Sequence, residues 1–171
     1  ENIALTRKVV ETAHEYGASV EAELGVVGGN EGGGKGHEIK YTDPAIADKF
    51  CKETGVDALA VAIGNAHGHY AVTPELRLDV LKSIDELCDT PLVLHGGTGI
   101  TPEVFQECIK RGIRKVNIAT ASFDAVAKAA KELTSTDKPN YFNLSQGMAD
   151  AVYENVKKHI KIFNMENLKS E

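Results

Sequence analysis

Four short segments rich in apolar residues alternate along this chain with amphipathic stretches, and this alternation restricts the possible folds more than any other feature. The segments lie near residues 19–24, 57–63, 91–95 and 115–119. Continuous apolar runs such as the second and third are typical of parallel strands that are buried on both faces. The sequence therefore predicts four strand–helix units in an α/β fold with a parallel sheet.

The helical stretches carry regular start signals. Three of them begin with a capping side chain directly before a proline, at Asp43-Pro44, Thr73-Pro74 and Thr101-Pro102. Further helical patterns cover residues 2–16, 121–134 and 144–162. The links from strand to helix are the longer ones and carry Gly, His, Asn and Thr residues. This asymmetry is typical of folds whose active site lies at the carboxyl ends of the strands.

Composition excludes several classes of protein. A chain of 171 residues that is 42% hydrophobic can bury one core, and its formal net charge of −6 without a basic stripe argues against nucleic-acid binding. No apolar run is long enough to cross a membrane. The three cysteines lack metal-type spacing, which predicts free thiols in a reducing compartment. We therefore expect a cytoplasmic protein that binds neither nucleic acid nor membrane.

Four strand–helix units correspond to half of a larger fold. A complete (β/α)₈ TIM barrel has eight strands and typically about 250 residues. An open sheet of four strands would leave apolar edges uncovered. We therefore expect residues 1–171 to form half of one barrel domain, completed either by upstream sequence or by another chain.

Two histidines follow successive predicted strands. His67 and His95 each stand beside glycine, and imidazoles at matching strand ends can reach one shared ion, such as zinc. Glu23 is the best third ligand, because period-two alternation turns it away from the apolar face of its strand, together with Glu21. His37 and His69 are weaker candidates. For His14 and His159, which fall on helical patterns, we expect ordinary structural roles.

Two strand-to-helix turns suit a phosphate group. The turn at residues 96–99 offers glycine backbone N–H groups and the Thr98 hydroxyl, and residues 117–120 end the fourth predicted strand where a helix begins. The last two such loops of a TIM barrel frequently bind phosphate. The glycine-rich segment at residues 25–36 is too flexible for regular structure. It is either a lid over the site or a surface insertion.

Four segments, at residues 19–25, 62–68, 92–99 and 115–120, resemble in order the class II, zinc-dependent ketose-bisphosphate aldolases. The resemblance implies a (β/α)₈ barrel that forms homodimers or larger assemblies. It also implies cleavage of fructose or tagatose 1,6-bisphosphate to dihydroxyacetone phosphate and glyceraldehyde 3-phosphate. The matched segments align with the second, C-terminal half of the barrel.

The resemblance also implies roles for individual residues. His67 and His95 match zinc ligands, and Glu23 matches a glutamate near an alternative position of the metal. A monovalent cation, Na⁺ or K⁺, often lies near the phosphate in this family. The positions that would hold dihydroxyacetone phosphate are Gly68, Gly96, Gly97, Thr98, Asn117, Ile118, Ala119 and Thr120.

Two departures from the family pattern matter. The His-x-Asp-His segment, which carries the acid/base aspartate and another zinc ligand, has no counterpart in these residues, so we expect the isolated chain to be inactive. Many fructose-type members carry lysine where this chain has Ala71, which favours a tagatose-type substrate and leaves a deoxy-keto-gluconate phosphate open. The alternatives are a non-catalytic half-barrel that binds phosphate or assembles with another chain, and a phosphosugar isomerase or epimerase.

Overall fold

One parallel sheet organises the molecule. The computed structural model describes residues 1–29, 39–70 and 74–165. The sheet has the strand order β1-β3-β5-β6, and all three pairings are parallel. Its strands are β1 (Glu21–Leu24), β3 (Ala58–Val61), β5 (Leu92–Leu94) and β6 (Ile113–Val116). The four predicted strand–helix units are confirmed, although β6 ends before the predicted segment does.

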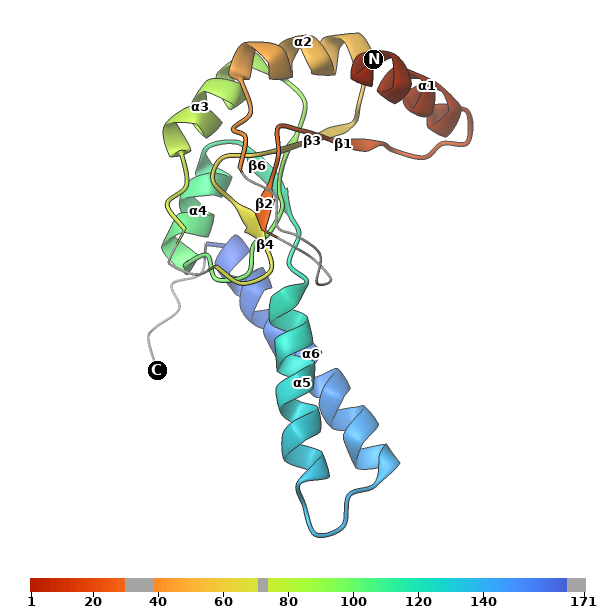
Figure 1. The fold of residues 1–171 in the computed structure, drawn as a ribbon, viewed down its shortest axis with the longest axis vertical. Coiled ribbons are helices and arrows are strands. Elements are labelled where there is room, and N and C mark those ends of the chain that lie inside the picture. The colour runs from red at the N-terminus through yellow and green to blue at the C-terminus, as the bar shows by residue number, and fades with distance from the viewer. Residues whose placement is uncertain (30–38, 71–73, 166–171) are drawn as a thin grey trace.

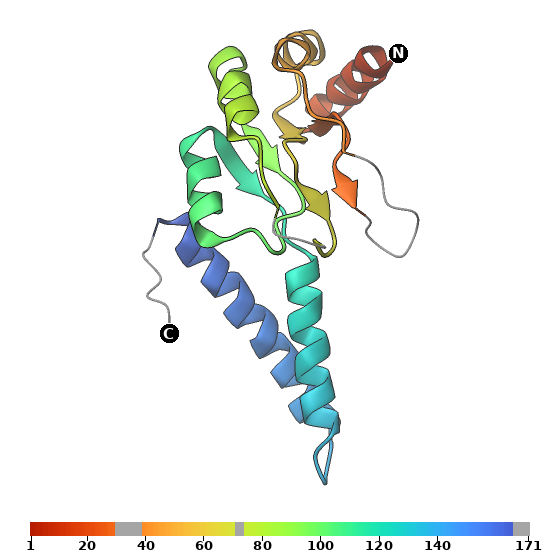
Figure 2. The ribbon, with the colours of Figure 1, turned by 60° about the vertical axis from the view of Figure 1, so that its left-hand side comes forward.

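Helices cover one face of this curved sheet (Figures 1 and 2). They are α1 (Asn2–Glu15), α2 (Pro44–Thr54), α3 (Leu78–Leu87) and α4 (Pro102–Lys110). Alternate strand residues, such as Leu59 and Leu92, face these helices and are buried in one core cluster with Phe50 and Phe105. The opposite face holds a row of residues in register, Glu23, Ala60, Val93 and Lys115. The apolar face therefore builds the core, and the opposite face is left for polar groups.

Two of the three predicted helix starts are confirmed. The Asp43 carboxylate accepts from two N–H groups of the first turn of α2, and the Thr101 hydroxyl accepts from the Val104 N–H. The third prediction is wrong, because α3 begins only at Leu78. Leu76 is buried and the Arg77 N–H donates to the Ile63 carbonyl at 2.7 Å, so this stretch is held against the end of β3. Thr73 lies outside the described residues.

Two long helices form an arm that extends away from the sheet (Figures 1 and 2). These are α5 (Thr120–Thr134) and α6 (Tyr141–Phe163), close to the predicted bounds. The carboxyl end of α6 returns to the body, where Ile162 is buried in the core and its carbonyl accepts from Gln106 of α4. No helix in the described part of the chain is long and apolar enough to cross a membrane.

The glycine-rich segment contains regular structure, contrary to the sequence prediction. Strand β2 (Gly28–Gly29) pairs in parallel with β4 (Ala66–His67). The pairing is possible because the backbones approach closely: a Cβ on Gly29 would lie 2.1 Å from the His67 carbonyl oxygen. Residues 30–38, including Lys35 and His37, lie outside the described residues, and the lid prediction falls on them.

The prediction that the cysteines are free thiols is confirmed. All three cysteines of the chain are free and buried, at Cys51, Cys88 and Cys108. None of them belongs to the polar face of the sheet, since all three pack within the hydrophobic core.

Candidate metal centre

Strand β1 presents two carboxylates on the polar face of the sheet. Its residues alternate as predicted, so that Ala22 and Leu24 pack against the core while Glu21 and Glu23 face the other way. Both carboxylates reach His95, although strand β3 separates β1 from β5. The register places Ala60 of β3 between Glu23 and Val93, and this small side chain leaves the path open.

The two histidines reach the site from different backbone positions. His95 directly follows β5, as predicted, whereas His67 lies in β4, well beyond the end of β3 at Val61. Their rings are nevertheless 5.8 Å apart between centroids, with an interplanar angle of 49°. The predicted convergence of the two imidazoles is therefore present.

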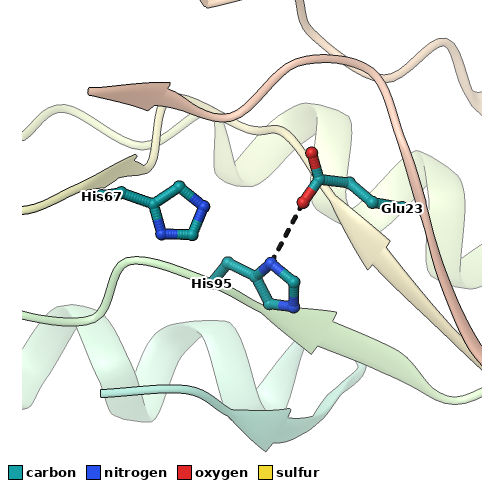
Figure 3. A group of neighbouring side chains, drawn as sticks. All are labelled: Glu23, His67 and His95. Atoms are coloured by element: carbon teal, nitrogen blue, oxygen red, sulfur yellow. Dashed lines mark ion pairs between the residues drawn. The ribbon is translucent and has the colours of Figure 1, made fainter. Parts of the chain in front are cut away.

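Glu23, His67 and His95 form a cluster suited to a metal ion (Figure 3). One ligand atom from each residue lies within 4.8 Å of those of the other two. The carboxylate Oε2 of Glu23 lies 3.0 Å from Nδ1 of His95. Two imidazoles and one carboxylate are a frequent ligand set of catalytic zinc, which leaves a further coordination position for water or substrate. The donors therefore fit the ion that the sequence predicts.

The charges around His95 favour positive charge at this position. The hydrogen bond with Glu23 is the main cause of a raised His95 pKa, and Glu21 adds to it against the effect of burial. The same contact lowers the pKa of Glu23. Partial burial alone would raise the pKa of Glu21, but hydrogen bonds with His95 and Lys115 outweigh it, so that pKa is also lowered. An acidic pair around an imidazole is an environment that stabilises a bound cation.

Lys115 connects this cluster to the predicted phosphate loops. Its ammonium lies 2.9 Å from Glu21 Oε2 and 2.6 Å from Asn117 Oδ1. Glu21 in turn lies 2.8 Å from Nε2 of His95. One chain of contacts therefore runs from the loop after β6 to the imidazole.

The two predicted phosphate loops contact each other. The Gly97 N–H donates to the Asn117 carbonyl at 3.1 Å, and the Thr98 hydroxyl accepts from the Ala121 N–H at 3.0 Å. A Cβ on Gly97 would lie 2.7 Å from Ile118, so glycine is required for this approach. These contacts join the two loops at the amino end of α5, the place where backbone N–H groups favour an anion.

The three other histidines in the described part of the chain have partners outside the cluster. His69 is exposed and lies 3.5 Å from Asp124, His14 pairs with Asp57, and His159 packs against Phe105 at the base of the arm. The sequence predicted no role for Glu21, Lys115, Asn65 or Tyr70. Period-two alternation places Glu21 on the same face as Glu23, but it does not identify His95 and Lys115 as its partners. Lys115 lies in register with Val93 on the same face, which only the strand pairing reveals.

The fold and the cluster define a class of protein. It is an α/β protein of the barrel type, with a candidate metal centre and loops suited to a phosphate group at the carboxyl edge of a parallel sheet. A family model for class II fructose-bisphosphate aldolases matches residues 1–168. The chain belongs to this family.

Relatives and solved structures agree with this assignment. Fructose-bisphosphate aldolases of Geobacillus stearothermophilus and Staphylococcus aureus are 45% and 44% identical over 84% and 98% of this chain. The structure of the YdjI aldolase from Escherichia coli K12 superposes with a TM-score of 0.82 and 37% identity over 97% of this chain. The chain spans 50% and 59% of the two relatives and 57% of the solved chain. The solved aldolases are TIM barrels, so the four strand–helix units correspond to part of such a barrel.

Proposed function

We propose that this chain supplies the zinc-binding and phosphate-binding elements of a class II aldolase that cleaves a ketose 1,6-bisphosphate to dihydroxyacetone phosphate and glyceraldehyde 3-phosphate. The observation that supports this most strongly is the cluster of Glu23, His67 and His95, whose ligand atoms lie within 4.8 Å of one another. The family membership and the two joined loops beside the cluster support the substrate class.

Each group of residues would have a separate task. His67, His95 and Glu23 would hold zinc, which when bound supplies a Lewis acid that neutralises negative charge developing on the substrate oxygens. Gly68 would lie beside the substrate, next to the ligand His67. The other residues proposed to bind dihydroxyacetone phosphate are Gly96, Gly97, Thr98, Asn117, Ile118, Ala119 and Thr120, with a Na⁺ or K⁺ ion near the phosphate.

Proton transfer needs a group that these residues do not supply. The sequence has no His-x-Asp-His segment, and the carboxylates of Glu21 and Glu23 are both engaged with His95. We therefore propose that residues 1–171 bind the ketose-derived phosphate but do not turn over substrate without further residues. Ala71 in place of a lysine supports tagatose 1,6-bisphosphate as the preferred sugar.

We also propose a homo-oligomer in the cytoplasm. The arm carries large apolar side chains that are exposed in this chain, and such patches mark association surfaces. They include Phe123, Tyr141, Phe142 and Tyr153, with exposed fractions of 69%, 74%, 80% and 62%. The three free cysteines fit a reducing compartment.

Binding and turnover together test the proposed function. Calorimetry should show that dihydroxyacetone phosphate binds to zinc-loaded chain and that a chelator or His95→Ala abolishes this binding. Cleavage of tagatose and fructose 1,6-bisphosphate should be absent for the chain alone. It should appear when the part of the Staphylococcus aureus relative outside the matched region is co-expressed. Binding that survives both metal removal and His95→Ala would contradict the proposal, and phosphosugar isomerisation without metal would favour an isomerase.

A further inference from the structure

Asn65 connects the two histidine-bearing loops from a fully buried position. Its side chain has an exposed fraction of 0%. The Oδ1 atom accepts from the Ile63 N–H of its own loop at 2.8 Å, and the Nδ2 group donates to the carbonyl of His95 at 3.0 Å. One amide therefore ties the backbone of the second histidine to the segment that carries the first.

Tyr70 makes a second connection between the same loops. Its hydroxyl accepts from the Ala66 N–H at 2.8 Å and donates to the Gly96 carbonyl at 2.9 Å. Ala66 directly precedes His67, and Gly96 directly follows His95. Asn65 thus contacts the backbone of His95 itself. Tyr70 contacts the residue before His67 and the residue after His95.

The loops need such connections because strand pairing does not fix His67 relative to His95. The pairing of β3 with β5 reaches only Ala60 and Val93, and His67 lies beyond it in β4. The loops are nevertheless in close contact, since a Cβ on Gly96 would lie 2.1 Å from the Ala66 carbonyl oxygen. A metal site keeps its affinity only when its ligands are held to within about 0.5 Å of the required positions.

We propose that Asn65 and Tyr70 are positioning residues that together form a brace between the two loops, and that this brace sets the separation of His67 and His95 and so the affinity and geometry of the metal bound between them. The inference rests on the proposed metal centre. Neither side chain is a ligand, because both use their polar atoms on backbone groups.

Cobalt(II) is a suitable probe for the test, because its visible absorption reports both binding and coordination geometry. The 171-residue chain is titrated with CoCl₂ beside Tyr70→Phe, which removes one hydroxyl and keeps the ring. Tyr16→Phe, at the exposed carboxyl end of α1, is the matched control. Asn65→Ala is a second variant that acts on the other connection. Circular dichroism confirms that each variant is folded, and thermal unfolding is recorded without metal.

The brace predicts that Tyr70→Phe raises the dissociation constant for Co²⁺ by about tenfold or more and alters the absorption at saturation, as expected for groups that orient metal ligands. Asn65→Ala should do the same, and Tyr16→Phe should do neither. Unchanged affinity and spectrum in folded Tyr70→Phe and Asn65→Ala, with only a lower unfolding temperature, would overturn the brace alone. Co²⁺ binding that is absent in the parent, or insensitive to His67→Ala and His95→Ala, would overturn the metal centre and the brace together.

Discussion

Glu23 lies on β1 and His95 directly follows β5, two strands that do not pair with each other, yet their side chains meet at 3.0 Å between Oε2 and Nδ1. Adjacent strands are about 4.8 Å apart, so the two backbones are separated by roughly twice that distance. The contact exists because a long carboxylate side chain and an imidazole extend toward each other over Ala60, which presents only a methyl group.

A larger residue at position 60 should therefore separate the two ligands. We expect Ala60→Val to weaken zinc binding by at least about tenfold, a loss on the order of 1.4 kcal/mol. The control is Ala22→Val, which adds the same methyl groups on the opposite face of the sheet. Competition with a chromophoric chelator measures both affinities. Equal zinc affinity of parent and Ala60→Val would show that Glu23 does not reach the metal over this strand.

The Thr98 hydroxyl should stabilise the amino end of α5. Ala119, at the N-cap position of this helix, makes no side-chain capping hydrogen bond, and Thr98 from another loop accepts from the Ala121 N–H instead. We expect Thr98→Val to lower the free energy of unfolding by about 1 kcal/mol and Thr98→Ser to change it little. Urea denaturation measures the difference. The two variants should also differ in calorimetric affinity for dihydroxyacetone phosphate, and equal behaviour would remove Thr98 from the proposed phosphate site.

The buried thiols should resist alkylation in the folded protein. Burial is the main cause that raises the pKa of Cys51 and of Cys108 to about 12, far above pH 8. The thiolate is the reactive form, so both groups stay protonated and unreactive. Iodoacetamide at pH 8 followed by mass spectrometry should show neither residue modified until urea is added. Rapid labelling of Cys108 in the native chain would contradict the buried position.

Asp57 should contribute stability that depends on pH. It pairs with His14 at 2.9 Å and accepts from the Val20 N–H at 2.7 Å, and these contacts lower its pKa from 3.8. Because this pKa is lowered on folding, the Asp57 carboxylate stabilises the folded state fully above about pH 3.8. This stabilisation is lost as the pH falls through the pKa of Asp57 in the folded protein. Asp57→Asn should therefore unfold at a lower temperature than the parent at pH 7, and the gap should narrow below pH 4. Glu11→Gln, on the exposed side of α1, is the control. A gap that stays constant with pH would contradict the lowered pKa of Asp57.

The regular elements of this fold were predictable, because their signals are local. Period-two alternation assigned Glu23 to the polar face of β1, and capping side chains before proline assigned the starts of α2 and α4. The start of α3 was not predictable in the same way. There a long-range hydrogen bond from Arg77 to Ile63 competes with the local preference of Pro74 and delays the helix.

The residues of the site were also predictable only where the sequence carries a local signal. Strand ends indicated His67 and His95, since the carboxyl ends of parallel strands meet at one edge. Strand β2 was missed because a glycine run carries no periodic signal, and its pairing with β4 depends on close approach of two backbones. Asn65 and Tyr70 were missed because their partners are backbone groups of a loop that only the folded chain brings near.

The central claim is that Glu23, His67 and His95 hold one metal ion. Anomalous diffraction recorded on either side of the zinc absorption edge, from crystals of the zinc-loaded chain, tests it most directly. The claim predicts one strong peak per chain, within about 2.2 Å of a nitrogen of each imidazole and of a Glu23 oxygen or a water in its place. A zinc peak bound by other residues, with the rings of His67 and His95 turned apart, would contradict it.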